Sequence, residues 1–243
     1  MSELLVRPTG GAVRVEMEYV GFEVLPLDGA ESRETGDREL CVVLVQGECR
    51  VNDWELAGRE DPWSGPAGAA YLPPRTQVEL SGRGEVALCW APANGGAEAR
   101  VLPAGEVEHR GRGNHARQVR PILMGGEAAD SLLVCEVITP EGHWSSYPPH
   151  KHDQDDMPEE SFLEETYYHR VKPERGFALQ RVYTQDRTLD ETLAAHDRDT
   201  VLVPRGYHTV SAPPGYALYY LNVMAGPTRA WAIQNDPDHE WTM

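Results

Sequence analysis

Short runs of apolar or alternating residues, separated by turn-forming residues, are the feature that most constrains how this chain folds. Val, Tyr and Leu are common within the runs, and 23 glycines and 19 prolines interrupt the chain. Val, Tyr and Leu suit pleated strands, whereas Gly and Pro mark turns. The pattern predicts a mostly β protein, with strands at residues 40–45, 69–72, 85–90, 131–138, 162–169, 176–183, 200–203 and 217–223. The best helical candidate is residues 189–196, which we expect to form a turn or one short helix.

The composition indicates a folded, acidic protein. Of 243 residues, 40% are hydrophobic and 8% aromatic, which is typical of a packed globular chain of one large or two ordinary domains. The net charge of −17 repels phosphate backbones and anionic membranes, so we expect neither nucleic acid nor a membrane as a partner. The sequence shows neither a signal peptide nor an apolar run of membrane-spanning length. These features predict a soluble cytoplasmic protein.

The four cysteines are expected to be reduced core residues. Cys41, Cys49, Cys89 and Cys135 show no CxxC spacing, and the first, third and fourth lie in apolar runs. A thiol in such surroundings behaves as a small hydrophobic group.

A faint internal repeat suggests that the chain contains two related β-barrels. YLPPRTQV at residues 71–78 aligns with VLVPRGYH at residues 201–208, with Leu, Pro and Arg coinciding, although so short a match can also arise by chance. In this alignment Val78 takes the place of His208. We therefore predict an N-terminal barrel at residues 1–110 without a metal site and a C-terminal barrel at residues 111–243 that binds metal.

Three histidines in the second half have the spacing of metal ligands. Residues two apart on a strand point to the same face, so His150 and His152 can direct both imidazoles at one point. His208 follows a Pro-Arg-Gly turn and begins another strand-like segment. Alternate residues of every strand face the inside of a barrel, so ligands from different strands can converge there.

Glu165 is the preferred carboxylate ligand, with Glu159, Glu160 and Glu164 as competitors. It shares strand parity with Tyr167 and His169, whereas Glu164 would face the other way. Imidazoles with a carboxylate suit a divalent zinc, manganese, iron or nickel ion.

The remaining polar segments have weaker predicted roles. His169 is expected to be a hydrogen-bonded wall residue of the barrel, and His143, His196 and His239 to be solvated. Residues 153–160 carry five carboxylates and are expected to form a solvated loop or the edge of a lid. Arg110 and Arg117 lie in a glycine-rich basic segment that is either a solvated linker or an element that reaches an acidic substrate or clamps the other barrel.

Beyond the ligand order, several longer strings resemble one family. They are WSSYPPHKHD at 144–153, LEETYYHR at 163–170, QRVYT at 180–184, VPRGYH at 203–208, LYYLNVMAG at 218–226 and DPDHEW at 236–241. The order His-x-His, Glu, His is that of the cupin superfamily. The strings are similar to those of the 5-deoxy-glucuronate isomerases of bacterial myo-inositol catabolism, densely from about residue 113 onward.

This resemblance implies a fold and a set of ligands. The family is bicupin, with two tandem jelly-roll-like β-barrels, and is related to the uronate ketol-isomerase of pectin breakdown. Its metal ligands carry over to His150, His152, Glu165 and His208. Generic cupins place the carboxylate within a few residues of the second histidine, whereas twelve residues intervene here.

The resemblance also implies an activity, the interconversion of 5-deoxy-D-glucuronate and 2-deoxy-5-keto-D-gluconate. This reaction moves a proton between adjacent carbons through an enediolate, whose oxygens a divalent cation can stabilise. Arg181 and Tyr183 share one strand face and are our candidates for a carboxylate anchor and a proton-handling hydroxyl, with Glu165 or metal-activated hydroxide as alternative bases.

Residue spacing alone also allows two other functions. The first is an iron-dependent cupin dioxygenase, and the second is a non-catalytic bicupin that binds sugar acids. For all three functions the expected partner is a small sugar acid, and tandem cupins often form homo-oligomers.

Overall fold

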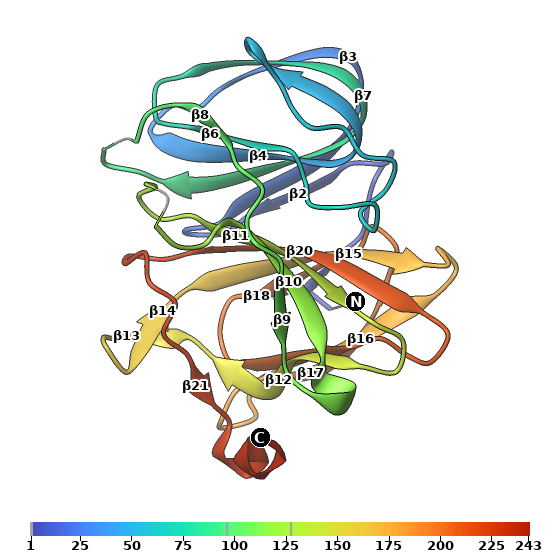
Figure 1. Cartoon of the computed structure of the whole chain (residues 1–243). Coiled ribbons are helices and arrows are strands. Elements are labelled where there is room, and N and C mark those ends of the chain that lie inside the picture. The colour runs from blue at the N-terminus through green and yellow to red at the C-terminus, as the bar shows by residue number, and fades with distance from the viewer. Residues whose placement is uncertain (1, 96, 127) are drawn as a thin grey trace.

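The computed structural model describes residues 2–95, 97–126 and 128–243. In these ranges the chain forms 21 strands, β1 to β21, and two 3-10 helices, η1 (Gly113–His115) and η2 (Pro237–Thr242). Two barrels lie one above the other in Figure 1, with the N-terminal strands at the top and η2 at the bottom. The predicted all-β fold with two tandem barrels is confirmed.

One bent antiparallel sheet forms the N-terminal barrel. Its strand order is β2-β3-β7-β4-β6-β8, and β5 pairs with β4. Three strands of 14 to 16 residues provide most of its area, and β3 and β4 both pair with β7 along their length. The bounds are β2 Val13–Glu16, β3 Gly21–Glu34, β4 Arg38–Val51, β5 Trp54–Glu55, β6 Ala69–Leu72, β7 Gln77–Pro92 and β8 Arg100–Leu102.

Two facing sheets form the C-terminal barrel. The sheet next to the N-terminal barrel has the order β1-β18-β15-β20-β11-β10-β9, and the far sheet has the order β17-β16-β19-β12-β21. The near strands are β1 Leu5–Val6, β9 Glu108–Arg110, β10 Arg117–Leu123, β11 Leu133–Thr139, β15 Glu164–Lys172, β18 Thr200–Val203 and β20 Ala217–Ala225. The far strands are β12 Trp144–Lys151, β16 Phe177–Tyr183, β17 Asp190–His196, β19 Tyr207–Ser211 and β21 Gln234–Asn235, and a hairpin of β13 Asp153–Asp156 and β14 Glu160–Phe162 projects beside them.

Alternation along the strands divides the apolar residues among three main cores. One core fills the N-terminal barrel with side chains such as Leu40, Val42 and Leu88. A second lies between the two sheets of the C-terminal barrel. The third joins the barrels, because odd residues of β4 and the outward face of β20 pack against one another. Each barrel therefore buries one face of its sheet only in the presence of the other barrel.

The chain crosses between the sheets near the predicted domain boundary. Strand β8 ends at Leu102 in the N-terminal sheet, and β9 begins at Glu108 in the C-terminal barrel. Strand β1 is an exception, because Leu5 pairs with Val201 of β18. The division into 1–110 and 111–243 stays a prediction, with the first strand contributing to the second barrel.

The eight predicted strand segments all lie in or overlap strands, but the predicted helix is wrong. Residues 190–196 form β17, which pairs antiparallel with β16 from Asp190 opposite Tyr183 to His196 opposite Phe177. Leu193 and Ala195 alternate inward with exposed neighbours. Ala and Leu favour helices locally, but pairing with a neighbouring strand decides the conformation.

Several smaller predictions are also tested by the fold. All four cysteines are free and buried, as expected. Val78 is fully buried in the N-terminal core, so an apolar side chain occupies the position that the repeat assigns to His208 in the other barrel. Among the described residues, we find no helix with the length and apolar character needed to cross a membrane.

Candidate metal centre and its cavity

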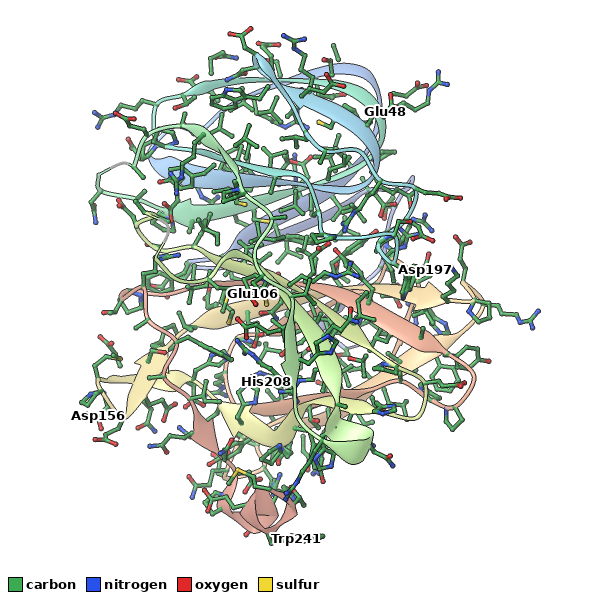
Figure 2. All side chains as sticks on the ribbon, in the orientation of Figure 1. Glu48, Glu106, Asp156, Asp197, His208 and Trp241 are labelled. Atoms are coloured by element: carbon green, nitrogen blue, oxygen red, sulfur yellow. The ribbon has the colours of Figure 1, made fainter. Side chains whose placement is uncertain are left out.

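Three histidines converge inside the C-terminal barrel. His150 lies on β12 and His208 directly opposite it on β19, while His152 follows the last residue of β12. One ligand nitrogen from each imidazole lies within 4.8 Å of the others, and all three residues are buried. His208, labelled in Figure 2, points into the space between the two sheets. The strand pairing therefore brings together two segments that are far apart in sequence.

Glu165 approaches the same point from the opposite sheet. It lies on β15, and its Oε2 is 3.0 Å from His152 Nε2 and 2.9 Å from His208 Nε2. Its other oxygen accepts a hydrogen bond from the Asn222 side-chain amide on β20. The structure thus places all four predicted ligands at one point.

The hydrogen bonds of the imidazoles leave one buried nitrogen, His208 Nε2, without a partner among the described residues. His152 Nδ1 lies 2.9 Å from Leu163 O, and His208 Nδ1 lies 3.1 Å from Gly206 O, so each Nδ1 carries hydrogen and donates to a carbonyl. His152 Nε2 also lies within hydrogen-bond distance of Glu165 Oε2, at 3.0 Å, and this contact raises the pKa of His152. For His208 the contact lacks hydrogen-bond geometry, and its buried Nε2 has no hydrogen-bond partner among the described residues. A cation bound at this nitrogen would supply the missing partner.

The charges at this point are strongly coupled. Burial acts to raise the pKa of Glu165, but the nearby His208 and the hydrogen bond with His152 hold it well below its usual range. Burial and the two other imidazoles hold the pKa of His150 well below its usual value. An ionised carboxylate beside neutral imidazole is the donor set that a divalent cation requires.

The competing glutamates have other partners. Glu164 faces away from the histidines and accepts hydrogen bonds from the backbone amides of Glu18, Tyr19 and Val20. Glu160 is buried in an ion pair with Lys151, 2.7 Å between Oε2 and Nζ. Glu159 is exposed.

A cavity opens beside the four residues. Its empty volume is about 450 Å³, part of which is open to solvent. Polar side chains on its wall come from six positions, Arg110, Arg117, Ser146, Tyr167, Tyr220 and Asn222. The reading of the basic segment as a solvated linker is therefore wrong for these two arginines, which face the cavity. Strand parity with Glu165 points to Tyr167, and the basic segment offers Arg110 and Arg117 as one alternative, but no sequence signal identifies Ser146, Tyr220 or Asn222.

Arg181 and Tyr183 do not face the cavity. The Tyr183 hydroxyl donates to Asp236 Oδ2 at 2.5 Å, and Arg181 forms a bidentate pair with Asp190 at 2.8 Å for each contact. Burial and Asp236 raise the pKa of Tyr183 above its usual value. The inward residues of β16 are Gln180 and Val182, the latter opposite His208. Parity predicted correctly that Arg181 and Tyr183 share a face, but that face lies on the outside of the barrel.

The other histidines named above lie away from the candidate metal ligands. His169 is fully buried and its Nε2 is 2.8 Å from Gln180 Oε1, in agreement with the predicted wall role. His196 is exposed as predicted, whereas His143 and His239 are half-buried. In the acidic hairpin, Asp155 and Asp156 are exposed, and Figure 2 shows Asp156 at its tip.

Comparison with known proteins agrees with this geometry. The model of the KduI/IolB family matches residues 8–242. The chain belongs to the KduI/IolB family. The predicted family is therefore confirmed, with a match that covers nearly the whole sequence.

Individual relatives and structures support the same assignment. The 5-deoxy-glucuronate isomerase of Geobacillus kaustophilus (strain HTA426) is 52% identical, with 96% of this chain and 91% of the relative covered. That of Bacillus subtilis (strain 168) is 45% identical, with coverages of 94% and 89%. The crystal structure of an IolB-like protein from Salmonella typhimurium LT2 has a TM-score of 0.92 at 42% identity and 99% coverage of both chains.

A more distant structure shows the fold class. Oxalate decarboxylase of Lactobacillus farciminis has a TM-score of 0.64 at 12% identity, covering all of this chain and 91% of the other. At this identity only the fold is shared. The two barrels of this chain form a bicupin, as predicted.

Proposed function

We propose that this chain is a metal-dependent aldose-ketose isomerase that interconverts 5-deoxy-D-glucuronate and 2-deoxy-5-keto-D-gluconate. The observation that carries the proposal is the convergence of three histidines and Glu165 on one point beside a cavity with two arginines. The isomerase class agrees with the names of relatives that are up to 52% identical.

His150, His152, Glu165 and His208 are the proposed metal ligands. Zinc, manganese, iron and nickel all suit three imidazoles and one carboxylate. When bound, such a cation supplies Lewis-acid stabilisation for the negative oxygens of an enediolate.

The wall residues position the substrate and handle protons. Ser146 Oγ lies 3.0 Å from the Tyr167 hydroxyl, and Ser145 Oγ lies 2.7 Å from the Tyr220 hydroxyl. Burial and the nearby Glu165 hold the pKa of Tyr167 well above its usual value, and burial raises the pKa of Tyr220 to about 12. Both phenols are therefore protonated at neutral pH and serve as hydrogen-bond donors to substrate oxygens, not as bases.

Glu165 is the proposed base. It is the one carboxylate among the described residues that line the cavity. Its low pKa keeps it ionised at neutral pH, and Asn222 fixes one of its oxygens. The ionised carboxylate can accept a proton from one carbon and return it to the next, while the lowered pKa limits its strength as a base.

A metal-loaded sample of the full chain tests the proposal. Under nitrogen and without a redox cofactor, it should convert 5-deoxy-D-glucuronate to the keto acid, followed by NMR, and His208→Ala should abolish the conversion. Oxygen consumption during turnover in a parallel air-saturated sample would indicate a dioxygenase instead. Binding of the sugar acid by a metal-loaded protein without turnover would indicate a binding protein.

The cellular setting and the assembly belong to the same proposal. We place the enzyme in the cytoplasm, acting on a small sugar acid without nucleic acid or membrane as a partner, and we expect a homo-oligomer by analogy with other tandem cupins.

A further inference from the structure

Two arginines stand directly opposite each other at the cavity wall. Arg117 begins β10 and Arg110 ends β9, and the two residues are register partners in this antiparallel hairpin. Both line the cavity that contains His150 and Glu165. Like charges placed directly across a strand pair are destabilising, so this arrangement calls for an anion that compensates it.

Only one of the two arginines is neutralised within the described chain. Arg110 donates to Glu108 Oε2 at 2.6 and 2.7 Å and stacks over Trp231 with its guanidinium carbon 5.1 Å from the ring centre. Arg117 donates to the carbonyl of His115 at 3.1 Å, and no ion pair joins it to any residue that the structure describes. The pair thus has two positive charges and one negative charge.

The charge of Arg117 acts on the inside of the barrel. It works against the effect of burial on the pKa of Tyr220, whose hydroxyl group is fully buried. The side chain is half-buried, and Val119, two residues along β10, packs in the core of the barrel. The guanidinium is therefore partly removed from solvent, where a charge-assisted hydrogen bond is stronger than at an open surface.

We propose that Arg117, with Arg110 beside it, binds the carboxylate of the sugar acid while the other end of the substrate lies at the metal ligands. The inference rests on the proposed function and adds the residue that selects a uronic acid over a neutral sugar. A planar guanidinium with two free donors matches a carboxylate better than an ammonium group does. In a chain of net charge −17, this local positive pair also offsets the general repulsion of an anionic substrate.

Arg117→Met in the metal-loaded full chain tests the assignment, with Arg112→Met as the matched control. Arg112 lies in the same turn, carries the same charge and is exposed outside the cavity. For Arg117→Met we expect a KM raised about 30- to 300-fold with kcat within about threefold, the effect of losing a charge-assisted bidentate contact. Arg117→Lys, which keeps the charge but not the fork, should lose about 3- to 10-fold.

Binding of two probe sugars separates this inference from the proposed function. The dissociation constants of both sugars are measured by calorimetry. For Arg117→Met, the dissociation constant of D-glucuronate should rise by the same factor as the KM. The weak binding of D-glucose, which lacks the carboxylate, should not change. Glu108→Gln should bind D-glucuronate about 3- to 10-fold more tightly, because it removes the anion that competes for Arg110. A gain of affinity cannot be caused by misfolding.

The outcomes are distinct. One outcome is a wild-type protein that binds metal and glucuronate but does not isomerise, together with loss of glucuronate binding in Arg117→Met. This outcome would support the carboxylate site and contradict the proposed function. Normal isomerisation with the same KM and glucuronate affinity in Arg117→Met and Arg112→Met would overturn the carboxylate site alone. Absence of any preference for glucuronate over glucose in the wild type would overturn it as well.

Discussion

At the scale of single residues, three of the four candidate ligands are held by a specific neighbour. Leu163 O and Gly206 O orient two of the imidazoles, and the Asn222 amide fixes Glu165. Such outer contacts set the direction of the donor atoms before a metal binds, which lowers the cost of assembling the site. The geometry of the site therefore depends on residues that never touch the metal.

The ligand assignment makes a direct prediction about metal content. His150→Ala and His208→Ala remove an imidazole from the point where the donors converge, so purified protein should lose its stoichiometric metal in elemental analysis. Val78→Ala changes the corresponding position of the N-terminal barrel and should retain the metal. Full metal content in either histidine variant would refute the assignment.

Asn222→Ala should weaken the site without dismantling it. Glu165 then loses the donor to one oxygen, and we expect kcat or metal affinity to fall about 10- to 100-fold. Steady-state kinetics and a chelator titration measure the two effects. Asn114→Ala, at an exposed position in η1, is the control. Equal values for the two variants would show that the amide does not support Glu165.

His169 should make the fold less stable as the pH falls. Burial lowers its pKa to about 4 from the usual 6.5. Below pH 6.5 the unfolded chain binds a proton that the folded chain excludes, so stability is lost as the pH falls until about pH 4. The loss from this residue between pH 7.5 and 4.5 is about 2 to 3 kcal/mol.

The measurement is urea unfolding in the presence of a chelator at both pH values. His169→Gln should lose less stability on acidification than the wild type by about that amount, whereas His196→Gln, at an exposed position, should behave as the wild type. An unchanged pH dependence in His169→Gln would contradict the prediction.

At the scale of elements, a buried ion cluster connects the strands that carry the histidines. Lys151 Nζ lies 2.8 Å from Asp153 Oδ1 and 2.7 Å from Glu160 Oε2. The other oxygen of Asp153 accepts the amide of Gly206 at 2.9 Å, and the carbonyl of Gly206 in turn binds His208. The β13–β14 hairpin thus holds the turn between β18 and β19 in place.

Asp153→Asn should loosen that turn. The amide has one acceptor oxygen where the carboxylate has two, so either Lys151 or Gly206 loses its partner. We expect metal affinity to fall about 10- to 100-fold with an unchanged circular dichroism spectrum. Asp156→Asn, at the exposed tip of the same hairpin, is the control. An equal metal affinity in both variants would argue that the hairpin does not hold the turn between β18 and β19 in place.

The strands and metal ligands could be predicted because their signals are local. Alternation over a few residues is enough to identify a strand, and His150 and His152 are brought together by the geometry of one strand. Glu165 could be separated from Glu164 by parity alone, and the structure places it at the histidines.

The sequence leaves the role of Arg110 and Arg117 open between a solvated linker and a contact with substrate or the other barrel, because their placement depends on the packing of the whole barrel. Parity tells which residues share a face but not whether that face is inside, so Arg181 and Tyr183 were assigned to the wrong side. Arg110 and Arg117 face inward because the hairpin that carries them extends the near sheet over the cavity. For residues 190–196, helix propensity competed with an edge pairing that only the three-dimensional structure shows.

At the scale of the whole molecule, the two barrels are joined by buried charges as well as by apolar residues. Arg59 of the first barrel pairs with Glu136 of the second at 2.6 Å, and Glu85 lies 3.0 Å from Arg170 and 2.8 Å from Arg198. Removing one member of such a buried pair leaves an uncompensated charge. The interface is therefore a part of the fold and not a surface between independent domains.

Residues 111–243 expressed alone should not fold, although they contain all four candidate ligands. The outward face of the near sheet, including Leu221 and Val223, would be exposed, and β18 would lose β1. We expect insoluble protein or a non-cooperative urea transition. The intact chain should show one transition by both fluorescence and circular dichroism. A soluble, cooperatively unfolding fragment that binds metal would show that the barrels are independent.

The pairing of β1 with β18 also has a consequence for the order of events during synthesis. Residues 5 and 6 are synthesised long before their hydrogen-bonding partners, residues 200 and 201. The backbone amides of residues 18–20 likewise have no hydrogen bond to Glu164 until that residue has been synthesised. Folding of N-terminal segments usually begins while later residues are still being added. Here β1 has to stay unpaired until β18 has been synthesised, so the nascent chain exposes this segment to chaperones and proteases while the residues between the two strands are being added.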